Sequence, residues 1–203
     1  MYNCIFSAHC TEVICDKSCP ALVETSYLLE RNEISMSSFV FREPKSSIDK
    51  VCKFLDQFDG KLGVYVAKGD NDTVKASTLL TYCAICKNWQ GSRLHCNVYN
   101  LKYSSYLEDL KQSWNARSDG EDLEYKKIWT NSSKILIVSN FDYVNFGDFE
   151  SQTLLNLIQY RQDKGLTTIL VTPPINSLIS TKKSSFFDLL KNNMSKIAKA
   201  VKL

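Results

Sequence analysis

The sequence predicts an α/β protein whose parallel β-sheet is flanked by helices. Short apolar runs, typical of buried strands, lie at residues 61–66, 134–142 and 166–172. Helical segments separate them, and strands that alternate with helices are characteristic of a doubly wound sheet. The 203 residues are 44% hydrophobic, which is enough for a full core. No apolar run approaches the roughly 20 residues of a membrane span, so no membrane partner is expected.

The elements divide the chain into three predicted regions. Residues 1–31 form a Cys-rich module that ends in a helix at 20–31, and residues 32–47 form a polar linker. Residues 48–203 form the α/β domain, which begins with a helix stopped by Asp59 and Gly60. We expect its last 22 residues to form a lysine-rich amphipathic helix that docks on the domain or binds DNA or a partner.

The first strand leads into a loop that resembles a degenerate phosphate-binding motif, G-x-x-x-x-G-K-[ST]. Gly69 and Lys75 have the required separation, but Val74 replaces the second glycine and Ala76 replaces the hydroxyl residue that would hold Mg²⁺. Ser77 is turned by about 100° around the helix, away from the phosphates. Lys75 still offers a point charge to a phosphate. An ordinary strand–turn–helix would explain the same letters.

The strand at 134–142 has the character of a Walker B strand without its acids. Ser139 and Asn140 occupy the positions of the Mg²⁺-binding aspartate and its acidic neighbour. Asp142 follows three residues later, where a bulge could bring it inward. We therefore expect ATP or ADP binding to be weak or absent, and we assign no catalytic residue.

The order of these elements, over residues 1 to about 180, resembles the DnaC/DnaI-type helicase loaders of the AAA+ ATPases and the related IstB-like ATPases. The resemblance rests on the strand–loop–helix at 62–88, the segment 95–114, EYKKIW before the second strand, and LLNLIQYRQDKGLTTILVTPP at 154–174. It implies an AAA+-like P-loop NTPase fold with a truncated C-terminal lid. It also implies a sensor Asn at the end of the last strand, where this chain has Thr172, and a trans-acting Arg, although no Arg follows Arg161.

Half of the eight cysteines lie near the start of the chain, at Cys4, Cys10, Cys15 and Cys19. Four such thiolates can close a tetrahedral zinc site, and the alternative is an iron–sulfur cluster. His9 could replace one ligand, and disulfides or free thiols are further alternatives. No secretory signal is recognisable, so we expect a cytoplasmic protein, in the host cytoplasm if it is phage-encoded, and favour zinc. Loaders of the DnaI type carry a Cys-rich module that contacts the helicase.

Lys102, Tyr103 and Tyr106 follow the strand expected near residue 100, where the family places residues that face single-stranded DNA. Base stacking on tyrosine beside a lysine charge would suit that contact. An amphipathic helix explains the same residues without DNA.

These observations favour a phage-like, catalytically degenerate helicase-loader-like adaptor. Its expected partners are a replicative helicase, a competent loader paralogue, or both. The alternatives are an active ATP-dependent loader that binds single-stranded DNA, and a loader mimic that inhibits host replication.

Overall fold

The computed structural model describes residues 20–34, 45–67, 72–88, 97–114, 120–141 and 144–173. The chain divides into two compact units. Unit 1 comprises residues 1–57 and 78–98, and unit 2 comprises residues 58–77 and 99–203. The predicted Cys-rich module and the predicted helix at the end of the chain lie outside the described residues.

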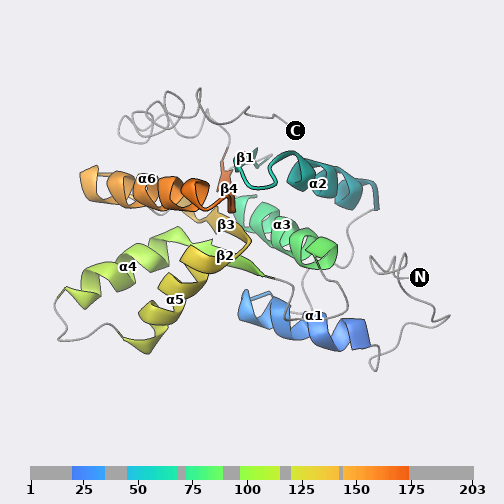
Figure 1. Ribbon diagram of the computed structural model, residues 1–203, viewed down its shortest axis with the longest axis horizontal. Coiled ribbons are helices and arrows are strands. Elements are labelled where there is room, and N and C mark those ends of the chain that lie inside the picture. Colours follow the sequence, from blue (N-terminus) through green and yellow to red (C-terminus); the bar gives the residue numbers. More distant parts are fainter. Residues whose placement is uncertain are drawn as a thin grey trace. The chain divides into compact units, whose positions relative to one another are not determined.

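The described elements follow the predicted alternation of helices and strands (Figure 1). In chain order they are α1 (Pro20–Arg31), α2 (Lys45–Gln57), β1 (Leu62–Val66), α3 (Thr73–Asn88), β2 (Val98–Lys102), α4 (Tyr103–Ser113), α5 (Glu121–Ser132), β3 (Ile135–Ser139), α6 (Asp148–Asp163) and β4 (Thr167–Thr172). The strands form one sheet in the order β1-β4-β3-β2. The predicted α/β class is therefore confirmed, while the AAA+ subdivision stays a prediction.

Strand β4 occupies the centre of the sheet and pairs in parallel with both β1 and β3. All six of its side chains are buried, which explains its continuous apolar and threonine-rich sequence. On the β1 side, Gly63 lies opposite Ile169. A Cβ at Gly63 would lie 2.7 Å from the Phe58 ring and 2.8 Å from the Ile169 side chain, so glycine is required for this close packing.

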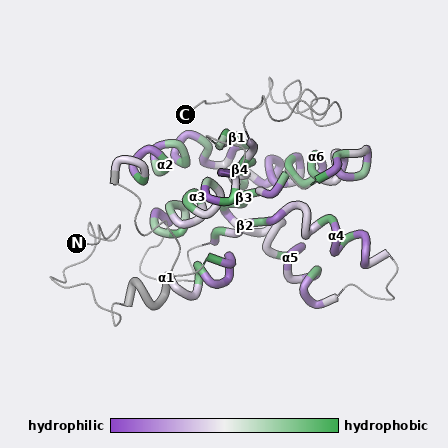
Figure 2. Tube along the Cα trace, turned by 180° about the vertical axis from the view of Figure 1, so that it is seen from behind, coloured by the Kyte–Doolittle hydropathy of each residue, from purple (hydrophilic) through white to green (hydrophobic). Residues whose placement is uncertain are grey.

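Helices α4, α5 and α6 cover one face of the sheet in unit 2 (Figure 1). Along the tube these helices alternate between hydrophilic and hydrophobic colours, as amphipathic helices do (Figure 2). Tyr103 is fully buried among the rings of Phe141 and Phe146, and its hydroxyl donates to the Glu150 carbonyl at 2.6 Å. Burial raises the pKa of Tyr103, so the hydroxyl remains a donor.

The Glu150 side chain fixes the beginning of α6. One carboxylate oxygen accepts from the Gly147 N–H at 2.9 Å, and the other pairs with Lys111 of α4 at 2.7 Å. Burial acts to raise the pKa of Glu150, but the hydrogen bonds from Lys111 and Gly147 outweigh it and lower the pKa. The carboxylate therefore stays ionised, caps the helix and ties α4 to α6.

Arg161 is the largest fully buried side chain in the described part of the protein. Its Nε donates to the Thr168 hydroxyl at 2.9 Å, and Nη1 donates to the Thr130 carbonyl at 2.7 Å. Nη2 donates to the carbonyls of Ser133, at 2.9 Å, and Thr167, at 2.6 Å. One guanidinium thus joins α6, the end of α5 and the beginning of β4. Burial lowers the pKa of Arg161 to about 10, against a smaller opposing effect of Tyr160, and the group remains charged at neutral pH.

Unit 1 contains α1, α2, most of α3 and Val98. Arg31, at the end of α1, donates to the Val98 carbonyl at 3.0 Å, and the buried Asn32 amide donates to the Leu28 carbonyl at 2.8 Å. Lys87 of α3 forms an ion pair with Asp56 of α2. These contacts hold the helices of the unit to one another and to the first residue of β2.

The Arg161 contacts predict a large loss of stability in the Arg161→Met variant. Methionine keeps much of the apolar packing but leaves the carbonyls of Thr130, Ser133 and Thr167 without this donor. Each buried unsatisfied group costs about 1–3 kcal/mol, so we expect the free energy of unfolding to fall by roughly 3–5 kcal/mol. Urea denaturation followed by circular dichroism measures the loss.

Lys164→Met is the matched control, because Lys164 lies three residues later and is exposed. Its ammonium lies 6.0 Å from the Tyr160 ring centroid, an exposed contact worth about 0.5–1 kcal/mol. Equal stabilities of Arg161→Met and the unmodified protein would show that the buried guanidinium is dispensable.

Candidate functional site

The predicted nucleotide-binding residues gather at one edge of the sheet. Strands β1, β4 and β3 are parallel neighbours, so the segments after Val66, Thr172 and Ser139 leave the sheet from the same edge. The Ala67 N–H donates to the Thr172 carbonyl at 2.8 Å and closes the pairing there. In open α/β sheets, ligands bind beyond the carboxyl ends of the strands. Gly69 and Asp142 lie outside the described residues.

Lys75 lies in the first turn of α3 with 67% of its side chain exposed. Its ammonium lies 3.9 Å from a carboxylate oxygen of Asp72, which immediately precedes the helix. A phosphate bound here would meet that carboxylate at the helix N-terminus, where negative charge is favoured. Asp72 therefore competes with a phosphate both for Lys75 and for the helix end.

The hydroxyl of Ser77 is committed to its own helix. Ser77 is buried, and its Oγ donates to the Val74 carbonyl at 3.0 Å. Val74, in the place of the motif's second glycine, is 53% exposed. The predicted inability of Ser77 to replace the missing Mg²⁺ ligand agrees with this geometry.

Ser139, in the position of the Mg²⁺-binding aspartate, is buried with 1% exposure at the end of β3. Its hydroxyl donates to the Asn100 side-chain oxygen of β2 at 3.3 Å. A buried neutral hydroxyl that is bonded inside the sheet lacks the charge and the accessibility of a metal-binding carboxylate.

Asn140 follows with a φ of 64° and is half-buried. Asparagine tolerates this left-handed conformation better than most residues, so Asn140 allows the chain to turn out of the sheet. Thr172, in the sensor position, is buried with 2% exposure. Among the residues of the site that the structure describes, Lys75 is an exposed cation, and Ser139 and Thr172 are buried neutral hydroxyls at the strand ends.

The three residues predicted to contact DNA differ in their exposure to solvent. Lys102 is exposed at the end of β2, but Tyr103 is fully buried and Tyr106 is 9% exposed. Base stacking requires an accessible ring face. In this conformation the two tyrosines belong to the core, and of the three side chains only that of Lys102 is exposed. A contact between Lys102 and DNA stays a prediction.

The sequence pattern did not identify two residues of the site, Asp72 and Asn100. Asp72 was visible as a carboxylate inside a phosphate-loop pattern, and that feature alone argues against anion binding. Asn100 gave no such signal, because a single Asn within an apolar strand does not reveal its neighbour across the sheet.

No metal centre is found among the residues that the structure describes: no group of three or more His, Cys, Asp or Glu side chains there is arranged to hold an ion. Cys4, Cys10, Cys15 and Cys19 lie outside those residues, so the zinc site stays a prediction. Within the described residues, no helix is long and apolar enough to cross a bilayer.

This chain is similar to a protein of known structure, but not to a known sequence family. No protein family matches the sequence, and no curated protein matches it. The crystal structure of the DnaC helicase loader is similar with a TM-score of 0.47 and 16% identity, over 72% of this chain and 82% of that chain. At that TM-score the similarity does not establish a shared fold, and the α/β class rests on the strand pairing described above.

The geometry predicts background ATPase activity that does not change in Lys75→Ala. The described part of the site offers no ionised group for Mg²⁺ at the end of β3. In ATPases and GTPases that use an arginine finger, this residue alone raises the rate of hydrolysis by a factor of about 10³–10⁵. Arg161, the last arginine of the chain, is fully buried and cannot supply one to a neighbour. Phosphate release measures ATP hydrolysis, and a fluorescent ATP analogue measures nucleotide binding.

Lys50→Ala, which removes an exposed lysine of α2, is the matched control. The triple variant Asp72→Gly, Val74→Gly, Ala76→Thr should bind the analogue more tightly than the unmodified protein. It removes the competing carboxylate and supplies the missing glycine and hydroxyl. A turnover in the unmodified protein that depends on Lys75 and matches ordinary ATPases would refute the degenerate site.

Proposed function

We propose that this protein is a helicase-loader-like adaptor that acts by binding and does not turn over ATP. The observation that carries the non-catalytic part is that the polar groups at the candidate site already have partners within the protein. Lys75 pairs with Asp72, Ser77 bonds its own helix, and Ser139 bonds Asn100. Catalysis of phosphoryl transfer needs such groups directed at Mg²⁺ and the phosphates instead.

The adaptor part rests on the sequence resemblance to DnaC/DnaI-type loaders. That resemblance places a Cys-rich module before the α/β domain, and in such loaders the module contacts the helicase. We propose that Cys4, Cys10, Cys15 and Cys19 hold one zinc ion, which would stabilise a module too small to have a core of its own. The partner we propose is the replicative helicase of the same replicon, a competent loader paralogue, or both.

A second candidate function, an active ATP-dependent loader, is favoured by one observation. Lys75 remains exposed in the first turn of α3, and its pairing with Asp72 is a long, exposed contact that a phosphate could displace. An inhibitor that mimics a loader would bind the same helicase. The adaptor and the inhibitor differ in whether helicase loading rises or falls when the protein is added.

The zinc proposal predicts about one equivalent of zinc in protein purified without chelators. Cys15→Ser should lower the zinc content, because it removes one of four thiolate ligands. The β-sheet of unit 2 should stay folded, since its buried strands do not depend on the metal. Elemental analysis and circular dichroism measure the two effects.

Cys86→Ser, in helix α3, is the control that should retain the zinc. If the purified protein is brown and contains iron, the four cysteines hold an iron–sulfur cluster in place of zinc. Metal-free protein in which residues 1–30 resist proteolysis would end the metal proposal.

The adaptor proposal predicts a monomer or dimer in isolation, with or without ATP, and a stable complex only with a partner. AAA+-type rings need a competent nucleotide site completed by a neighbour's arginine. Arg161 is buried, and the described residues at the end of β3 include no ionised ligand for Mg²⁺. Light scattering measures the mass, and affinity capture followed by mass spectrometry identifies the partner.

Recovery of the replicative helicase or a loader paralogue, with capture reduced in Cys15→Ser, would support the adaptor. A homohexamer induced by ATP would contradict it and would favour the active loader. Addition to a helicase-loading assay then separates an adaptor, which raises loading, from an inhibitor, which lowers it.

A further inference from the structure

The described part of unit 1 contains three cysteines that the proposed function does not use. Cys52 lies on α2, and Cys83 and Cys86 lie one turn apart on α3; all three are free thiols. Cys83 is fully buried, whereas Cys52 is only half-buried. Lys87, one turn after Cys83 on α3, donates to the Cys52 carbonyl oxygen of α2, so Cys83 faces α2 near Cys52, within reach of a hydrogen bond between the two thiols. A half-buried cysteine of α2 therefore lies beside a buried cysteine of α3.

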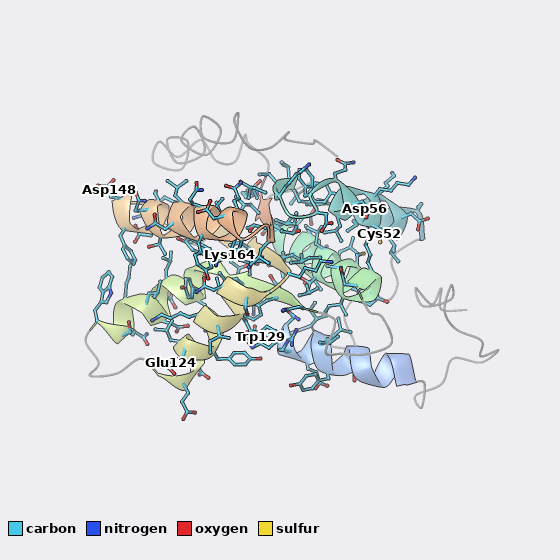
Figure 3. All side chains as sticks on the ribbon, in the orientation of Figure 1. Cys52, Asp56, Glu124, Trp129, Asp148 and Lys164 are labelled. Atoms are coloured by element: carbon cyan, nitrogen blue, oxygen red, sulfur yellow. The ribbon has the colours of Figure 1, made fainter. Side chains whose placement is uncertain are left out.

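A lysine lies beside this pair. The Lys87 ammonium lies 3.4 Å from the Cys52 carbonyl oxygen and forms an ion pair with Asp56, one turn after Cys52 on α2. In Figure 3, Cys52 and Asp56 are labelled on the same helix. Lys87 follows Cys83 by one helical turn, so the two residues lie on one face of α3. The positive charge is thus placed where it favours a thiolate at Cys52.

The surroundings of Cys52 and Cys83 shift the pKa values of the two thiols in opposite directions. The hydrogen bond from Cys83 lowers the pKa of Cys52 to about 7; burial and Asp49 oppose this effect, and Lys87 supports it. The same hydrogen bond and burial raise the pKa of Cys83. An accessible cysteine with a low pKa beside a protonated partner is the arrangement of an attacking thiol and a resolving thiol.

We propose that Cys52 and Cys83 form a peroxide-sensitive thiol pair that closes reversibly to a disulfide between α2 and α3. The Cys52 thiolate attacks one oxygen of hydrogen peroxide, the O–O bond breaks, and the other oxygen leaves as hydroxide, which becomes water on protonation. Cys52 is then a sulfenic acid. The Cys83 sulfur attacks the Cys52 sulfur, the S–O bond breaks, and a second water leaves with the Cys83 proton. Two thiols are oxidised and one peroxide is reduced to two waters.

The disulfide would tie α2 to the helix whose first turn carries Lys75. Cys52 and Cys83 are 31 residues apart in the sequence (83 − 52), and a crosslink over such a loop restricts the unfolded chain. We therefore expect oxidation to raise the midpoint of thermal unfolding and a dithiol reductant to reverse the rise. This inference does not depend on the adaptor function, because its readout is a covalent bond.

The test treats the reduced full-length protein with hydrogen peroxide, blocks remaining thiols with N-ethylmaleimide and maps the peptides by mass spectrometry. We expect a Cys52–Cys83 crosslinked peptide as the first product in this unit, and its loss in Cys52→Ser and in Cys83→Ser. Cys86→Ser is the matched control and should still form the link. Cys83→Ser should instead accumulate a sulfenic acid on Cys52, which dimedone traps.

Lys87→Gln tests the role of the neighbouring charge without removing a sulfur. We expect crosslinking of Lys87→Gln at neutral pH to be several-fold slower, and that of Lys50→Gln, at an exposed position of α2, to be unchanged. A Cys52–Cys86 link, or a Cys52 that stops at sulfenic or sulfinic acid while Cys83 stays reduced, would overturn the proposal. Since the unmodified protein gives these products directly, the test stands even if a serine variant fails to fold.

Discussion

The sheet of this protein depends on the buried guanidinium of Arg161. Its donors hold the carbonyls of Thr130 and Ser133, at the end of α5, and the residues Thr167 and Thr168, which begin β4. The carbonyls at a helix C-terminus carry partial negative charge and stabilise a cation, which makes α5 a suitable partner for a buried arginine. Because β4 lies between β1 and β3, these hydrogen bonds position the strand with which both of them pair.

The candidate site lies at the opposite, carboxyl end of the same strands. Its buried polar groups, like the guanidinium of Arg161, form hydrogen bonds within the protein. At Arg161 these hydrogen bonds stabilise the fold. At Ser139 and Ser77 the hydroxyls are not directed at a ligand, because they donate to the Asn100 side chain and to the Val74 carbonyl. A nucleotide site requires polar groups that the protein leaves available to a ligand. Within the described residues, these two hydroxyls therefore stabilise the sheet and the first turns of α3.

Part of this site could be predicted from the sequence, because part of it is local. The replacements by Val74, Ala76 and Ser139 are single residues at fixed separations along the chain, and they predict a degenerate phosphate-binding loop without any knowledge of contacts. The inward direction of Tyr103 could not be predicted in this way. Tyrosines three residues apart share one face of a helix, but the spacing does not say whether that face meets solvent or the core. Tyr103 packs against the rings of Phe141 and Phe146, which lie about 40 positions away in the sequence.

The sequence by itself determined the α/β class and the approximate positions of β1, β3, α6 and β4. Hydrophobic runs, helical periodicity and motif spacing report on neighbours along the chain, and these features depend on little else. Only the tertiary structure decided that β4 lies between β1 and β3, that Asp72 pairs with Lys75, and that Cys52 meets Cys83. Arg161 is the clearest case: as a letter near the end of a helix it resembles a surface cation. It is buried because four hydrogen-bond acceptors, two of them about 30 residues away in the sequence, converge on its guanidinium when the chain folds.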